Sequence, residues 1–156
     1  MQGQHQYNLT IKWTGNTGTG TKDYRSYDRD YTIYAENKAE ILSSADPTFR
    51  GDNTKYNPEE LLVASLSGCH MLSYLHLCAV AGIVVVEYSD NATGMMKQTS
   101  DGGGHFTEVT LYPQVVITDE TMIDQANALH HKASKLCFIA NSCNFPVHHK
   151  PNCVTK

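Results

Sequence analysis

The chain has 156 residues, of which 40% are hydrophobic and 18% are charged, which excludes an intrinsically disordered chain and fits one domain over residues 1–156. Sixteen acidic and twelve basic residues give a net charge of −4, and Lys and Arg form no cluster, so we expect no nucleic-acid partner. The five cysteines are an odd number, and the N-terminal segment lacks the basic and apolar stretches of a signal peptide. We therefore expect a cytoplasmic protein with reduced thiols.

The first third of the chain predicts strands joined by loops. Residues 6–13 alternate between apolar and polar side chains, which is typical of a half-buried strand. The Gly- and Thr-rich residues 14–21 predict an exposed loop, and the Tyr-rich residues 23–35 predict a second strand. Residues 36–56 are polar and are expected to be irregular.

One long helix follows. Asn57 is a good N-cap residue, Pro58 suits the first helical position, and two glutamates follow at the positive end of the helix dipole. Good helix formers continue until Gly82, and glycine is the usual residue just beyond a helix C-terminus. The sequence therefore predicts a helix over residues 58–81, roughly 36 Å long at about 1.5 Å per residue. Such a helix must be central in the fold or covered by a second subunit.

Part of this helix is long and apolar enough to raise the question of a membrane. Residues 61–81 contain no Asp, Glu, Lys or Arg, and a stretch of this length can span a bilayer. The stretch nevertheless holds Ser, His and Tyr side chains and has no basic flank on either side. We therefore expect a helix buried in protein and no contact with a membrane.

Two strand regions come after the helix. Residues 83–98 predict a strand, a turn near Asp90 and a second strand. Residues 105–117 predict further strand, in which Pro113 indicates an edge or a bulge. Four apolar residues of this region share one face of the strand: Val109, Leu111, Val115 and Ile117.

The last predicted elements are a second helix and a short strand. Apolar residues recur at helical spacing from Met122 to Cys137, which predicts a helix that starts near Asp119. A final strand near residues 144–149 closes the chain. The order of strands, long helix, strands, helix and strand predicts the α+β class.

Two cysteines lie on the two predicted core helices. Taken alone, Cys69 and Cys137 are each most simply interpreted as buried small hydrophobic residues, but a pair that meets can do redox chemistry. Cys78 shares a helix with Cys69 at a Cα separation of roughly 13 Å, beyond the roughly 7 Å limit for a disulfide. An intramolecular partner of Cys69 must therefore be Cys137, Cys143 or Cys153. The apolar stripe of the second helix points Cys137 toward the core and favours it.

Three segments carry a family resemblance. They are NPEELLVASLSGCHM (57–71), the preceding PTFRGDNTKYNPEE (47–60) and ASKLCFIANS (133–142), in which Ser134 and Phe138 replace a histidine and a proline of the usual pattern. Together they resemble the OsmC/Ohr family of thiol peroxidases for organic hydroperoxides. The resemblance implies an OsmC-like fold with antiparallel sheets packed on a long central helix and a second helix, in an intertwined homodimer.

The resemblance also implies roles for four residues. Cys69 would be the peroxidatic cysteine, Cys137 the resolving cysteine, and Arg50 and Glu59 their polar partners. A peroxidase needs the thiolate, and the helix dipole gives a mid-helix Cys69 little help, so an external cation is needed. Arg50 can supply that cation, and Glu59 can hold its guanidinium by a bidentate pair. Because Glu59 lies about 15 Å from Cys69 along a continuous helix, we expect Glu59 and Arg50 to come from the other chain of the dimer.

The implied activity is the reduction of organic hydroperoxides to alcohols in defence against oxidative stress. It would proceed through a sulfenic acid on Cys69 and a disulfide between Cys69 and Cys137. The expected partners are a second copy of the chain, the hydroperoxide and a dithiol reductant, either a lipoyl protein or a small thiol, with no metal or other cofactor. Four apolar residues are candidates for favouring organic over hydrogen peroxide: Leu66, Leu72, Phe138 and Ile139.

An alternative is a non-enzymatic dimer of the same fold that binds an apolar ligand or a metal. Neutral His and thiolate Cys are zinc ligands, and the C-terminal third holds seven residues of these types: His130, His131, Cys137, Cys143, His148, His149 and Cys153. The chain has no CxxC motif, and each pair of adjacent histidines points its rings apart. His70 points about 100° away from Cys69 on a helix, so a dyad between these neighbours is not expected.

Overall fold

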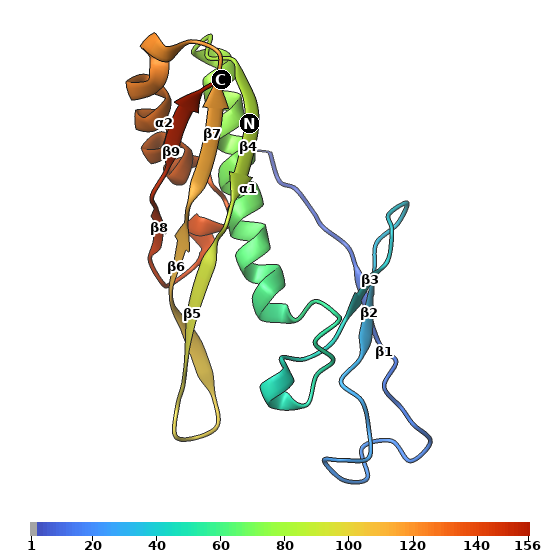
Figure 1. The fold of residues 1–156 in the computed structure, drawn as a ribbon. Helices are drawn as coiled ribbons and strands as arrows, with labels where there is room; N and C mark the ends of the chain where they lie inside the picture. Colours follow the sequence, from blue (N-terminus) through green and yellow to red (C-terminus); the bar gives the residue numbers. More distant parts are fainter. Residues whose placement is uncertain (1–2) are drawn as a thin grey trace. The chain divides into compact units, whose positions relative to one another are not determined.

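The computed structural model describes residues 3–156, and the chain divides into two compact units at Leu61 (Figure 1). The first unit runs up to Leu61, and the second comprises Leu62–Lys156. The division falls inside the long helix, which therefore begins in the first unit and continues in the second. The expectation of a single domain over residues 1–156 stays a prediction.

The first unit is built on a three-stranded antiparallel sheet. The strands β1 (Thr10–Trp13), β2 (Tyr31–Tyr34) and β3 (Ile41–Ser43) lie in the order β1-β2-β3. All four residues of β1 are exposed, so the prediction of a half-buried strand over residues 6–13 is wrong in length and in burial. The physical reason is that the described part of this unit contains no buried hydrophobic side chain for β1 to face.

The predicted loop over residues 14–21 is confirmed. Gly18 and Gly20 have φ angles of 120° and 57°, in the range that favours glycine. Their amides donate to the side-chain oxygen of Asn16 at 2.9 and 3.0 Å, so one amide side chain organises the turn.

The two segments after this loop differ from their predictions. The strand predicted over residues 23–35 shrinks to β2, because Arg29 donates hydrogen bonds to the backbone carbonyl oxygens of Tyr24 and Tyr27 and holds the preceding residues in turns. The stretch predicted to be irregular contains β3 and the short 3-10 helix Pro47–Phe49. It is therefore more ordered than its polar composition suggested.

Helix α1 (Pro58–Val80) confirms the predicted long helix to within one residue. The Glu60 amide donates to the Asn57 side-chain oxygen at 2.8 Å, and the Asn57 amide donates to the Glu60 carboxylate at 3.0 Å, which forms a capping box. At the other end Gly82 has a φ of 74°, and the Ile83 amide donates to a carbonyl oxygen of the last turn at 2.9 Å. Both ends are therefore set by local chemistry.

By length and composition alone, α1 could also cross a membrane. The core helix of an ordinary protein passes the same test. The buried side chains of α1 follow the spacing of one helix face: Leu66, His70, Tyr74, Leu77 and Cys78. That spacing is typical of a helix packed against protein.

The second unit contains two three-stranded sheets. Its strands are β4 (Val85–Asp90), β5 (Thr93–Gln98), β6 (Gly104–Leu111), β7 (Pro113–Ile117), β8 (Val147–His149) and β9 (Asn152–Thr155). The sheet orders are β4-β7-β9 and β5-β6-β8, and in each sheet the first pair is antiparallel and the second pair is parallel. Figure 1 shows β4 continuing into β5 and β6 into β7, so that the two antiparallel pairs form one long twisted ribbon.

Two strand predictions need correction. Pro113 opens β7, the central strand of its sheet, so it does not lie on an edge strand, but it pairs only with Asp90 of β4, because pairing with β9 begins at Gln114. A proline is tolerated there because the first residue of a strand can lack its amide hydrogen bond. The predicted final strand is confirmed as β8, but the chain continues into β9, which depends on parallel pairing with the distant β7.

Helix α2 (Ile123–Leu136) completes the fold after a 3-10 turn that begins at Glu120. Asp119 caps this turn by accepting from the Thr121 amide at 2.9 Å, which confirms the predicted start. The main core cluster joins α1, α2, β7 and β9 through these buried residues: Tyr74, Leu77, Cys78, Ile83, Val115, Ile117, Ala126, Ala133 and Cys153. The fold is α+β, as predicted.

Candidate active site

Cys69 lies on α1 at the edge of the buried helix face. Leu66 and His70 are 0% and 2% exposed, whereas Cys69 is only partly buried. Since successive residues of a helix are about 100° apart, Cys69 and His70 cannot both point into the centre of the same face. The Cys69 thiol is therefore held on a rigid helix while remaining partly open to solvent, as a nucleophile requires.

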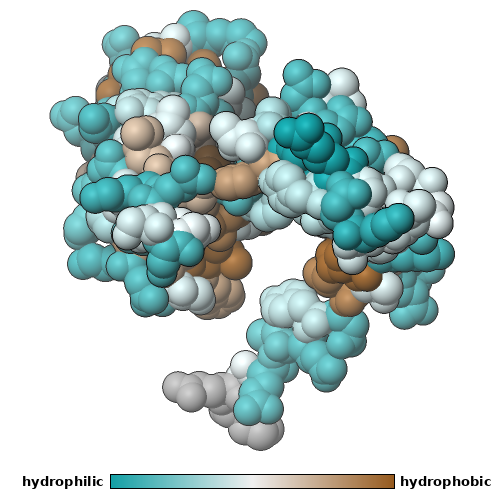
Figure 2. Space-filling model, turned by 90° about the horizontal axis from the view of Figure 1, so that it is seen from below, coloured by the Kyte–Doolittle hydropathy of each residue, from teal (hydrophilic) through white to brown (hydrophobic). Residues whose placement is uncertain are grey.

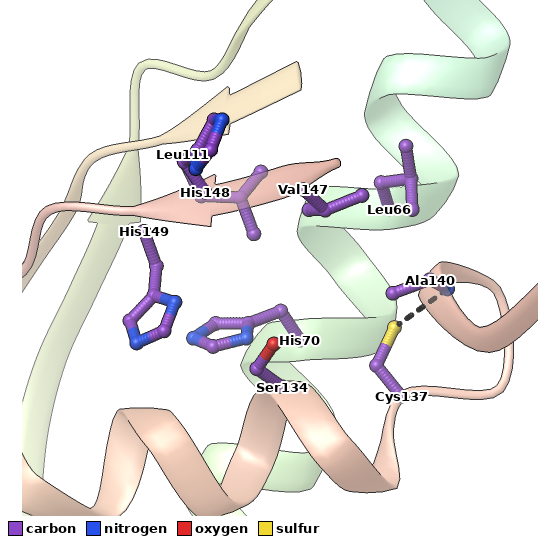
Figure 3. Close-up of a pocket in the computed structure, with 9 residues that line it drawn as sticks. All are labelled: Leu66, His70, Leu111, Ser134, Cys137, Ala140, Val147, His148 and His149. Carbon is purple, nitrogen blue, oxygen red and sulfur yellow. Dashed lines mark hydrogen bonds between the residues drawn. The ribbon is translucent and has the colours of Figure 1, made fainter. Parts of the chain in front are cut away.

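Cys137 lies at the C-terminal cap of α2, where the backbone becomes extended. Its side chain is 1% exposed, and its Sγ accepts a hydrogen bond from the Ala140 amide at 3.4 Å (Figure 3). Burial, followed by a hydrogen bond with the Cys69 thiol, raises the pKa of Cys137 to about 11. The structure thus brings two predicted site residues together as free thiols, and Cys137 is protonated at neutral pH.

The other two cysteines left open as partners of Cys69 are occupied elsewhere. The Cys143 thiol donates to the Ile139 carbonyl oxygen at 3.3 Å. Cys153 is buried in the main core cluster. Of the three alternatives, Cys137 is the one whose pKa is raised in part by the neighbouring Cys69.

The buried side of Cys137 faces a narrow cleft that has no room for a water molecule (Figure 3). One wall is apolar and is formed by Leu66, Leu111, Ala140 and Val147. The other residues that line the cleft are polar: His70, Ser134, His148 and His149. Cys137 therefore lies between apolar side chains and imidazole side chains.

The expected apolar surroundings are confirmed only in part. Leu66 lines the cleft, and Ile139 packs against the smaller core cluster around Leu66. Leu72 and Phe138 are 65% and 77% exposed, and their place beside the thiol stays a prediction. Leu111 also lines the cleft, from β6, which the sequence could not place next to Cys137.

Arg50 and Glu59 belong to the first unit. Arg50 is exposed and has a φ of 67°, a left-handed conformation that ends the 3-10 helix Pro47–Phe49. Glu59 lies in the first turn of α1, and one of its carboxylate oxygens is buried without a hydrogen-bond partner. A buried carboxylate oxygen without a donor is costly. Their roles beside the thiols stay predictions.

The structure also reveals a histidine pair that the sequence did not predict. His70 Nε2 and His130 Nδ1 lie 2.9 Å apart, although the two residues are 60 positions apart in the sequence. His130 is 0% exposed and stacks on the Tyr74 ring, with ring centroids 3.8 Å apart. The His149 ring lies 5.6 Å from the His70 ring, and Figure 3 shows the two rings turned toward each other.

Both members of this pair are neutral at physiological pH. Burial, as the main cause, lowers the pKa of His70 to about 4 and that of His130 to about 3. Burial also lowers the pKa of His149. The helical spacing of Leu66, His70 and Tyr74 is the sequence signal that could have placed His70 inside, but no local signal identifies His130 as its partner.

The metal-binding alternative gains no geometric support. Among residues 3–156, no group of three or more His, Cys, Asp or Glu side chains is arranged to hold a metal ion. The hydrogen-bonded nitrogens of His70 and His130 face each other directly and leave no space for an ion between them.

Comparisons with known proteins place this chain among OsmC-like proteins. The family model of the OsmC-like protein matches residues 51–152. An OsmC-like protein of unknown function from Vibrio cholerae is 32% identical, with a TM-score of 0.86, and the match covers 96% of this chain and 100% of that one.

More distant structures share the fold. An OsmC-like protein from Mycoplasma pneumoniae is 18% identical, with a TM-score of 0.71 and coverage of 96% and 98% of the two chains. An organic hydroperoxide resistance protein from Elizabethkingia anophelis, solved with thiocyanate bound, is 21% identical, with a TM-score of 0.68 and coverage of 98% and 99%. No curated protein matches the chain.

Proposed function

This chain belongs to the OsmC-like protein family, and on that premise we propose that it is a thiol-dependent peroxidase that reduces organic hydroperoxides to alcohols. The observation that carries the proposal is that Cys69, partly open to solvent, lies close enough to the buried Cys137 thiol to help raise its pKa. This is the arrangement that a peroxidatic and a resolving cysteine need. The likeness to organic hydroperoxide resistance proteins adds support at the level of the fold.

The first step is attack by the Cys69 thiolate on the terminal oxygen of the hydroperoxide ROOH. A sulfur–oxygen bond forms, the oxygen–oxygen bond breaks, and RO⁻ leaves and takes a proton from solvent to become the alcohol. Cys69 is left as a sulfenic acid. Because Cys137 stays protonated, its S–H can donate a hydrogen bond to the Cys69 thiolate before attack.

The second step is condensation of the two sulfur groups. The Cys137 sulfur attacks the Cys69 sulfenic acid, the sulfur–oxygen bond breaks, and hydroxide combines with the Cys137 proton to leave as water. A dithiol then reduces the disulfide by exchange and is itself oxidised to a disulfide. Leu66, Leu111 and Val147 make the surroundings of Cys137 apolar. We propose that apolar side chains around the thiols favour an organic substrate over hydrogen peroxide.

The direct test is peroxide consumption by the purified protein with either dihydrolipoamide or a small dithiol. We expect cumene hydroperoxide to be consumed, and Cys69→Ser to abolish turnover because serine is a far poorer nucleophile at neutral pH. After one equivalent of peroxide, peptide mapping should find Cys69 linked to Cys137. Cys143→Ser is the matched control and should retain turnover.

Two results would contradict this proposal. Turnover retained in Cys69→Ser would remove Cys69 as the nucleophile, and a disulfide between Cys69 and Cys143 would remove Cys137 as the resolving thiol. No consumption by the native chain, together with a bound metal in elemental analysis, would favour the non-enzymatic alternative.

We further propose that the active protein is a two-fold dimer in which the partner supplies Glu59 and Arg50. The first unit exposes apolar side chains on β1, among them Leu9 just before it and Ile11 within it, at 62% and 55%. Figure 2 shows hydrophobic surface, coloured brown, open to solvent on the face of the molecule that it views. A three-stranded sheet with an uncovered apolar face needs a partner, and a second copy supplies it. One Glu59 carboxylate oxygen has no hydrogen-bond donor within the described residues, and a guanidinium would supply one.

Complementation tests this dimer. Inactive Cys69→Ser and Glu59→Ala subunits, unfolded and refolded together, should form heterodimers with one intact site and regain activity. Heterodimers confirmed by mass but no more active than either parent would mean that each site is built within one chain.

A further inference from the structure

The hydrogen bond between His70 and His130 joins the two helices that carry the reacting cysteines. His70 lies on α1 directly after Cys69, and His130 lies on α2 two turns before Cys137. Both imidazoles are at most 2% exposed, and they meet through one nitrogen each, at 2.9 Å. The bond therefore lies in the interior, next to the thiol pair rather than on the surface.

Such a pair is an unusual choice for a helix interface. Two apolar side chains of similar volume would hold the helices together about as well, because burying polar groups costs much of what their hydrogen bond returns. What the imidazole pair adds is direction, since one nitrogen must face the other within hydrogen-bonding range. Tyr74 stacks on His130 at 3.8 Å and fixes the plane of that ring. The pair consequently holds α1 and α2 at one relative position.

The position of the two helices matters because disulfide geometry is narrow. A disulfide requires Cβ atoms about 3.5–4.5 Å apart, so a slide of about 1 Å between α1 and α2 would move the thiols out of range. His70 and Cys137 line the same narrow cleft, so a shift of one is transmitted to the other through close packing. We infer that the His70–His130 hydrogen bond positions Cys69 and Cys137 for disulfide formation, which makes both histidines positioning residues. This inference rests on the proposed Cys69–Cys137 disulfide.

The protonation states agree with this role. Both imidazoles are neutral near pH 7, because burial lowers their pKa values to about 4 and about 3. A neutral imidazole has one N–H and one acceptor nitrogen, so the pair can form a single directed hydrogen bond. His130 Nε2 is buried without a partner, so the 2.9 Å bond to His70 is the side-chain hydrogen bond that this ring makes within the described residues.

The equilibrium of the thiol pair with glutathione measures this positioning without any peroxide. One oxidised glutathione and the reduced protein exchange to give two reduced glutathiones and the Cys69–Cys137 disulfide, which balances atoms and electrons. The equilibrium constant reports the effective concentration of one thiol at the other. Loss of peroxidase activity alone would leave this constant unchanged, so the two proposals can fail separately.

Four single variants and one control separate a directed hydrogen bond from packing. A glutamine amide nitrogen can take the place of His70 Nε2, and an asparagine amide that of His130 Nδ1, so His70→Gln and His130→Asn can retain the bond. The leucine side chains of His70→Leu and His130→Leu fill the space of the imidazole but cannot form the hydrogen bond. His131→Leu is the matched control, because His131 is the exposed neighbour on the same helix.

We expect the two leucine variants to lower the equilibrium constant for the disulfide by about ten-fold or more. The glutamine, asparagine and control variants should stay within about three-fold of the native chain. Circular dichroism and thermal unfolding establish that each variant is folded. Leucine variants that are folded and match the native constant would overturn the inference, since packing alone would then suffice. If the leucine variants do not fold, a ten-fold loss in the folded glutamine and asparagine variants would overturn it instead.

Discussion

The two units of this chain are held together by different forces. In the second unit, buried side chains from two helices and three strands form continuous hydrophobic clusters. Every buried hydrophobic side chain among residues 3–156 lies at position 66 or beyond. The buried side chains of the described first unit are polar instead: Thr32, Ser43, Ser44 and Asn57. Backbone pairing and side-chain hydrogen bonds therefore order the first unit without a core.

This difference indicates that the second unit carries the reacting thiols, whereas the first unit provides a surface for a partner. The thiol pair needs fixed geometry, and it lies in the unit whose packing can provide it. The first unit carries Arg50 and Glu59, and it also exposes apolar side chains such as Leu9 and Ile11. A small sheet of this kind is marginal alone, so its order indicates a partner surface, which we propose to be a second copy of the chain.

The largest expected effect comes from the core of the second unit. Ile117 is 0% exposed on β7, and Ile117→Ala should lower the free energy of unfolding by about 2–5 kcal/mol through lost burial and a cavity. Urea unfolding followed by circular dichroism measures this change. A loss below about 1 kcal/mol would mean that the cluster is not the main source of stability.

Ile11→Ala is the matched change in the first unit. Ile11 is 55% exposed within the single chain, so its loss should cost less than about 0.5 kcal/mol at a dilution where the chain is monomeric. If a second copy covers β1, the cost should grow with protein concentration, because dimerisation then contributes to stability. A large cost that does not depend on concentration would contradict the contrast between the units.

The second prediction concerns acid and the buried histidines. His70 and His130 have pKa values lowered to about 4 and about 3, whereas an unfolded histidine titrates near about 6.5. Between these values the unfolded chain binds protons that the folded chain does not, so stability is present above about pH 6.5 and is lost as the pH falls. The groups around the pair are His149, Asp90 and Tyr74, and His149 is the one that further lowers the pKa of His70.

Urea unfolding at about pH 7 and about pH 5 should show a loss of about 2–4 kcal/mol in the native chain. The His70→Leu/His130→Leu double variant should lose much less over the same range, because it no longer carries the two titrating groups. His131→Leu should behave like the native chain, since His131 is exposed. Equal losses in all three proteins would assign the acid sensitivity to other groups.

Local chemistry explains which parts of the fold and site the sequence could predict. Asn57 and Gly82 predict the two ends of α1, and the alternating apolar residues around Val109 and Val115 predict strands. These features could be predicted because each depends on only a few neighbouring residues. β9 exists through parallel pairing with β7, which no local pattern encodes. The pairing of Cys69 with Cys137 was expected from the resemblance and from the apolar stripe of the second helix.

The histidine pair and the exposed β1 mark the limit of that reasoning. His70 was correctly expected to point away from Cys69, but its partner lies 60 residues further along the chain. The alternation over residues 6–13 was read as half burial because the rule assumes a core within the same chain. The described first unit has no such core, so the apolar side chains of residues 6–13 lie on the surface of the single chain.

An effect smaller than those of the core and of acid is expected at the start of α1, where the first unit passes into the second. The Asn57 side chain accepts from the Glu60 amide at 2.8 Å, and Asn57 is 6% exposed. Asn57→Ala should lower the free energy of unfolding by about 1 kcal/mol, because an amide at the helix N-terminus loses its acceptor. Asn57→Asp keeps an acceptor and adds a charge that suits the helix dipole, so it should leave the free energy of unfolding nearly unchanged.

Asn53→Ala, at an exposed turn position a few residues earlier, is the control and should change stability very little. If urea unfolding gives Asn57→Ala and Asn53→Ala the same stability, the cap contributes nothing, and the start of α1 must be held by packing rather than by its own sequence.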